Sequence, residues 1–104
     1  MHDGDAITTT YTGHELLDST GEKIGVVDDV IFDVETQEPR WALVKRGLLH
    51  PRPSAVPLDF GYRTPEGAIV VPYDKHLVAT APKVARDHVM TEDDERVLRV
   101  HYGG

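Results

Sequence analysis

The chain has 104 residues, of which 18 are acidic and 11 are basic, so its formal net charge is −7. This length fits one small domain, and an acidic surface repels the phosphate backbones of DNA and RNA. The sequence has no cysteine and no apolar run of 18 residues, which excludes disulfides, thiolate metal sites and a transmembrane helix. The polar N-terminus carries no secretory signal, so we expect a cytoplasmic protein without membrane insertion.

The first two strands are predicted at residues 11–18 and 23–33. The second is the longest run of β-branched and aromatic side chains and should be central. Asp28 and Asp29 each interrupt one of its two faces, and a β-bulge here resolves the pattern because one extra residue exchanges the faces. Bent, bulged strands are what a small closed barrel requires. Gly25 should lie where another backbone comes close.

The middle of the chain predicts further strands separated by turns. Alternating side chains indicate a strand over residues 40–46. Residues 47–53 contain two prolines, which cannot donate to a ladder, so we expect an exposed loop. Proline also confines the next strand, at residues 55–58, to an edge or a bulge. Residues 60–71 then read as a final hairpin.

Two helical segments are predicted after this hairpin. Asp74 is the expected N-cap of a short helical turn near residues 74–80. Thr91 is the expected N-cap of a C-terminal helix near residues 91–102, and carboxylates fill its first turn, where the helix dipole favours them. An apolar stripe that includes Leu98 should dock this helix on the barrel.

Four runs of sequence together resemble the signature of PRC-barrel domains, in that family's order: residues 21–33, 41–44, 56–58 and 70–75. The C-terminal residues look like a stand-alone bacterial subgroup of the actinobacterial type. The resemblance implies a mainly β fold, a small bent antiparallel β-barrel. Related domains occur in the cytoplasmic part of the photosynthetic reaction-centre H subunit and at the C-terminus of a ribosome-maturation factor, where they act through protein contacts.

The predicted organisation follows from the elements and the resemblance. Residues 1–10 should be a flexible N-terminus and residues 11–82 the PRC-barrel domain. Residues 83–104 should be a linker and the C-terminal helix packed on the barrel. Members of the family are often dimeric, so the resemblance also implies a homodimer.

The first functional hypothesis is a non-enzymatic interaction or scaffold module with no cofactor. Its candidate surface is Trp41, Leu48, Leu49 and Arg52, because two leucines at a loop tip are hard to bury in a small domain. Trp41 has a competing interpretation as a core residue, given the large area that its ring buries. The sequence does not identify the protein partner.

Two alternatives come from other functional classes. The first is an RNA- or ribosome-associated accessory factor, suggested by the resemblance and by a basic patch of Arg40, Arg46 and Arg52; the net charge argues against RNA and DNA. The second is a cation- or proton-handling cluster of the three acids discussed next.

The carboxylates in question are Asp28, Asp29 and Asp33. We interpret them mainly as structural acids, because a bulge leaves backbone donors that need acceptors and Asp33 is placed to begin the following turn. No histidine pair has zinc-ligand spacing, and neither serine lies in a G-x-S-x-G motif. The sequence therefore contains no recognisable catalytic motif.

Overall fold

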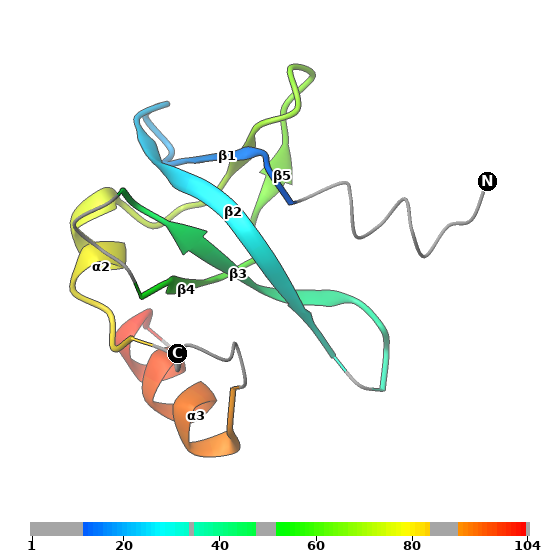
Figure 1. Ribbon diagram of the computed structural model, residues 1–104, viewed down its shortest axis with the longest axis vertical. Helices are drawn as coiled ribbons and strands as arrows, with labels where there is room; N and C mark the ends of the chain where they lie inside the picture. Colours follow the sequence, from blue (N-terminus) through cyan, green and yellow to red (C-terminus); the bar gives the residue numbers. More distant parts are fainter. Residues whose placement is uncertain (1–11, 34, 48–51, 84–89, 104) are drawn as a thin grey trace.

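The computed structural model describes residues 12–33, 35–47, 52–83 and 90–103. Within them, six strands form one sheet in the order β4-β3-β2-β1-β6-β5, accompanied by two helices (Figure 1). The mainly β prediction is confirmed. The elements are β1 (Glu15–Leu17), β2 (Lys23–Phe32), β3 (Pro39–Lys45), β4 (Ser54–Pro57), β5 (Tyr62–Arg63), β6 (Ile69–Val70), α2 (Lys75–Ala79) and α3 (Glu92–His101).

The sheet differs from the expected purely antiparallel barrel in one pairing. β1 pairs in parallel with β6, with Leu16 opposite Ile69, and the Val71 N–H donates to the Leu17 carbonyl at 3.0 Å. The other strand pairs are antiparallel, so the sheet is mixed, and across the described strands it is not closed. The partner of a strand as short as β1 is set by tertiary packing, which local sequence does not reveal.

The predicted bulge in β2 is confirmed. Val27 lies opposite Val44 and Asp29 opposite Leu43, so Asp28 is the extra residue. Val30 is buried together with Val27, although a regular strand would turn residues three apart to opposite faces. The bulge therefore brings Val27 and Val30 to the same buried face.

Gly25 lies where the neighbouring backbone comes close, as predicted. A Cβ atom at this position would stand 2.3 Å from the Lys45 carbonyl oxygen and 2.6 Å from a methyl carbon of Val44. At this position of β2, only glycine therefore fits against the end of β3 without a shift of the backbone.

The core has two parts, on opposite faces of β3. Ala42 and Val44 face the larger cluster, which the curved sheet encloses with α2. Trp41 and Leu43 face a second cluster, which Leu98 of α3 completes. Strand β3 is therefore buried on both faces, and α3 covers the face that the sheet leaves open (Figure 1).

Both helices begin as predicted. The Asp74 carboxylate accepts a hydrogen bond from the Leu77 N–H at 2.7 Å at the start of α2. Thr91 and Asp94 form a capping box at the start of α3, each side chain accepting from the other's backbone N–H. In the described ranges, no helix has the length and apolar character needed to cross a membrane.

Helix α3 lies against the sheet through Leu98 and Tyr102. Leu98 is 1% exposed within the second cluster. Close by, the Tyr102 hydroxyl donates to the Ala55 carbonyl of β4 at 2.7 Å. Burial raises the pKa of Tyr102, which keeps this hydroxyl a donor.

Candidate interaction surface

The four residues of the predicted interaction surface have different positions. Leu48 and Leu49 lie outside the described residues, and Arg52 is exposed. Trp41 is 1% exposed, because α3 lies against it, and its indole N–H donates to Glu95 at 3.2 Å. The ring of Trp41 is therefore packed in the core and is closed to a partner.

Asp28 and Asp29 lie at the bulge but point to different partners. The Asp28 carboxylate is 3.5 Å from the Lys45 ammonium group. The Asp29 carboxylate accepts from the Val30 N–H at 2.8 Å, beside the disrupted part of the ladder. Among the residues that the structure describes, no three His, Asp or Glu side chains are grouped to hold a metal ion.

Asp33 organises the turn between β2 and β3. One carboxylate oxygen accepts from the backbone N–H groups of Glu35 and Thr36 at 2.8 and 2.9 Å. The other accepts from the Arg40 guanidinium at 2.7 Å. These contacts, with the Thr36 N–H contributing most and Arg40 next, lower the pKa of Asp33 to about 2. Asp33 is therefore a fixed anion that holds the hairpin and orients Arg40.

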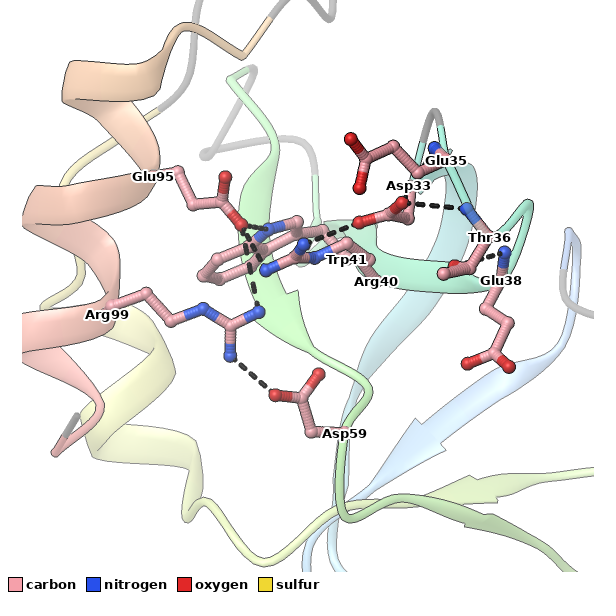
Figure 2. A network of polar contacts seen from close by, with 9 residues as sticks. All are labelled: Asp33, Glu35, Thr36, Glu38, Arg40, Trp41, Asp59, Glu95 and Arg99. Carbon is pink, nitrogen blue, oxygen red and sulfur yellow. Dashed lines mark hydrogen bonds and ion pairs between the residues drawn. The ribbon is translucent and has the colours of Figure 1, made fainter.

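A polar network extends from this hairpin to α3 (Figure 2). Glu95 accepts from Trp41 and lies 2.8 Å from the Arg40 guanidinium and 3.7 Å from that of Arg99. Arg99 pairs with Asp59 at 2.7 Å, and its guanidinium carbon lies 4.6 Å from the centre of the Trp41 ring. The network joins α3, the start of β3 and the turn after β4, three segments far apart in the sequence.

This network borders a hollow that we call the Pro39–Leu58 groove. It consists of two depressions, of about 540 and about 70 Å³, both lined by Pro39 and Leu58. The larger depression is also lined by Asp33, Thr36, Glu38, Arg40 and Asp59, and the smaller by Gly61, Tyr62, Arg63 and Ile69. The groove therefore has an apolar middle, one acidic end and one end formed by β5.

Two aromatic side chains beside the groove are the most exposed aromatics among the residues that the structure describes. Phe60 is 75% exposed and Tyr62 is 63% exposed. Phe60 lies in the turn after β4, where the Gly61 N–H donates to the Leu58 carbonyl at 3.1 Å. Sequence reasoning placed both aromatics in the final hairpin and missed their exposure. The sequence did contain a signal for the exposure of Phe60, because its neighbours Asp59 and Gly61 are residues typical of a turn.

A separate depression, of about 560 Å³, lies outside the groove, at the opposite end of the β2–β3 pair. Lys23, Lys45, Arg46 and Lys75 line it together with backbone of β2. Each of the three lysines has a carboxylate within 3.4–3.6 Å, from Glu15, Asp28 and Glu22 respectively. These pairs are mostly exposed and are individually weak.

The basic patch predicted from Arg40, Arg46 and Arg52 does not form as one cluster. Arg40 lies at the start of β3 and Arg46 just past its end. Six residues of extended strand separate them by about 20 Å, and Arg40 is already paired with Asp33 and Glu95. Burial together with the nearby Arg46 and Arg52 lowers the pKa of Lys83, so these two arginines lie near one amine and only Arg40 is separated from the predicted patch.

Comparison with protein families gives one result. A model of the PRC-barrel domain matches residues 9–78, which is most of the chain, so the chain belongs to the PRC-barrel family. A search of characterised protein sequences finds no significant match. The matched region ends within α2, so Glu95 and Arg99, which hold the network together, lie beyond it.

Proposed function

We propose that this PRC-barrel protein is a non-enzymatic protein-interaction module of the bacterial cytoplasm, with its contact surface at Phe60, Tyr62 and the Pro39–Leu58 groove. The observation that carries the proposal is the exposure of two large aromatic side chains, 75% and 63%, in so small a domain. Aromatic residues dominate the energy of protein interfaces, and clustered exposed apolar groups mark such sites. This surface replaces the buried Trp41 as the centre of the proposed contact.

The aromatic side chains stand on a well-supported turn. The Gly61 N–H bonds back to Leu58, and a Cβ atom at Gly61 would lie 3.3 Å from the Val70 carbonyl oxygen. The turn is therefore close against β6, and β6 is itself paired with β1. A partner would meet a preorganised surface, which reduces the entropy lost on binding.

A homodimer, which the family resemblance implies, is a second candidate with a different surface. Val97 and Val100 are 50% and 75% exposed on α3. They are three residues apart and so lie on one face of the helix. Two valines form a much smaller apolar area than a standard interface of about 800 Å² per partner, so this face is the weaker candidate.

The proposal is tested by comparing two double variants in the same capture experiment. Phe60→Ser/Tyr62→Thr removes the aromatic pair, and Val97→Ser/Val100→Ser removes a matched pair of exposed apolar side chains from α3. Both should leave the melting temperature nearly unchanged, because substitutions of exposed residues usually alter stability by about 0.5 kcal/mol or less.

Captured proteins from the source cell are then compared quantitatively. We expect at least one specific partner that the wild type and the α3 variant retain and the aromatic variant loses. If every retained protein is indifferent to Phe60 and Tyr62, this surface is not the contact site. Light scattering on the same variants tests the homodimer independently. If the dimer forms through α3, Val97→Ser/Val100→Ser should dissociate it and Phe60→Ser/Tyr62→Thr should not.

A further inference from the structure

We infer that the surface formed by Phe60, Tyr62 and the Pro39–Leu58 groove, called the Phe60–Tyr62 surface below, binds a basic, arginine-rich segment of another protein. It does not bind a second copy of this chain. The inference rests on the proposed function, because the same side chains form the surface. It adds the chemical class of the partner, which follows from the charges around the groove and from the contacts that these groups already make.

The polar side chains beside the groove have a surplus of negative charge. Five carboxylates and two guanidinium groups lie in and around the network in Figure 2, from Asp33, Glu35, Glu38, Asp59, Glu95, Arg40 and Arg99, and Glu35 and Glu38 join it through their backbone N–H groups. Arg63, which lines the β5 end, adds one positive charge and leaves a net charge of −2. The surface is therefore complementary to a cationic partner.

The positive groups of the network are already matched. The Arg40 guanidinium pairs with Asp33 and Glu95, and that of Arg99 with Asp59 and Glu95. The Glu38 carboxylate, at the rim of the groove, makes no ion pair with the residues that the structure describes. An incoming cation would meet this carboxylate without displacing an internal partner.

The structure itself shows how such a surface holds a guanidinium group. Arg99 lies 4.6 Å from the centre of the Trp41 ring while it pairs with Asp59 at 2.7 Å. An aromatic face combined with a carboxylate is the environment that arginine prefers, through cation–π and charge-assisted hydrogen bonds. Phe60 directly follows Asp59 in the chain and its ring is exposed, so an open aromatic ring lies one residue from the carboxylate that already holds Arg99.

A second copy is disfavoured by charge. In a two-fold dimer the same patch faces itself, so the surplus carboxylates of both copies would be brought together. The net charge of −7 on each chain adds to this repulsion. The same field attracts a basic partner and accelerates its encounter with the surface.

Strand addition at β5 is also disfavoured. β5 has only two residues. The Thr64 N–H donates to the Ala68 carbonyl, and alternate residues of an antiparallel strand direct their backbone groups to the same side. The backbone groups of Tyr62 and Thr64 therefore face β6. Only Arg63 then directs its backbone groups away, and Pro65 has no N–H to offer. Side chains, and not an extended ladder, must therefore provide the contact.

The test measures binding of a fluorescent, unstructured peptide of alternating arginine and small polar residues by anisotropy. A peptide with glutamate in place of every arginine is the reference. We expect the arginine peptide to bind more weakly as ionic strength rises and the glutamate peptide not to bind. Phe60→Ser/Tyr62→Thr should weaken binding about tenfold or more, and Glu38→Gln about two- to fivefold.

Glu22→Gln is the matched control, because it removes the same charge from an exposed glutamate at the other end of β2. The inference is overturned if Glu22→Gln weakens binding as much as Glu38→Gln, or if the glutamate peptide binds equally well. It is also overturned if light scattering finds a dimer that Phe60→Ser/Tyr62→Thr dissociates, since a second copy would then occupy the surface.

The two proposals fail in different ways. If the arginine peptide does not bind, but a captured partner still depends on Phe60 and Tyr62, the interaction surface stands and its basic specificity falls. If neither the peptide nor any captured protein depends on these aromatics, both proposals fall. Melting curves of each variant show that a loss of binding is not a loss of folding.

Discussion

Glu95 is the residue at which the packing of α3 can be tested most directly. One carboxylate oxygen accepts from the Trp41 indole N–H at 3.2 Å and lies 2.8 Å from the Arg40 guanidinium. Replacement by alanine removes these contacts, and the longer one to Arg99 at 3.7 Å, while keeping a good helix former in the first turn of α3. The Trp41 ring is 1% exposed, so its N–H would lose its acceptor inside the core.

The expected cost is the sum of two unequal parts. An unsatisfied buried donor costs about 1–3 kcal/mol, because the group keeps its desolvation penalty without a partner. The ion pair with Arg40 is partly exposed, 33% for Glu95 and 38% for Arg40, and contributes at most about 1 kcal/mol. Glu95→Ala should therefore lower the free energy of unfolding by about 1–4 kcal/mol. In a domain of this size the melting temperature falls by roughly 5–30 °C.

Urea unfolding followed by the fluorescence of Trp41, the only tryptophan, measures this change and reports α3 docking at the same time. Glu95→Gln keeps an acceptor for the indole and loses only the charge, so it should cost about 1 kcal/mol or less. Glu92→Ala removes an exposed carboxylate from the same helical turn and should cost about 0.5 kcal/mol through the helix dipole. If Glu95→Ala and Glu92→Ala agree within about 0.5 kcal/mol, the bond from Trp41 does not hold α3.

Two further predictions concern β2 and the turn that follows it. Gly25→Ala should destabilise the protein by about 1–3 kcal/mol in urea unfolding, because its Cβ would stand 2.3 Å from the Lys45 carbonyl oxygen. Gly61→Ala, which also lacks a positive φ but whose Cβ would come no closer than 3.3 Å to any atom, should cost less, and equal costs would contradict the clash. Asp33 has a pKa lowered from 3.8 to about 2 in the folded protein, so its contribution to stability is present above about pH 4 and is lost as pH falls through about 2. Asp33→Asn should therefore flatten the decline of stability over that range, and an unchanged slope in acid unfolding would show that Asp33 is not held as an anion.

The features that the sequence predicted correctly are those with a local physical cause. Two adjacent acids in an apolar strand conflict with a two-residue period, and the conflict predicted the bulge that exists at Asp28. Gly25 in the same strand predicted a close backbone. Thr91 before a run of carboxylates predicted the N-terminus of α3 to the residue.

The features that were missed depend on contacts between distant segments. The parallel pairing of β1 with β6 joins residues more than 50 positions apart and leaves no local pattern. The contact of Glu95 with Trp41 spans 54 positions, so a first-turn glutamate that suits the helix dipole also has a second partner. Phe60 and Tyr62 are good strand formers, but Phe60 lies in a turn and Tyr62 in a two-residue strand, and both side chains are exposed.

The groove and its polar border combine residues from the region that matches the family with residues of α3. Pro39 and Leu58, which form its apolar middle, lie within the region that matches the PRC-barrel family. Glu95 and Arg99 come from α3, outside that region, and they fix Arg40 and Asp59 by direct contact. Without α3, the Arg40 guanidinium would lose one of its two carboxylates and remain partly unmatched beside the groove. The sheet and its turns thus provide both the shape of the surface and its surplus carboxylates, whereas α3 adds one carboxylate and one guanidinium group that hold Arg40 and Asp59 in place.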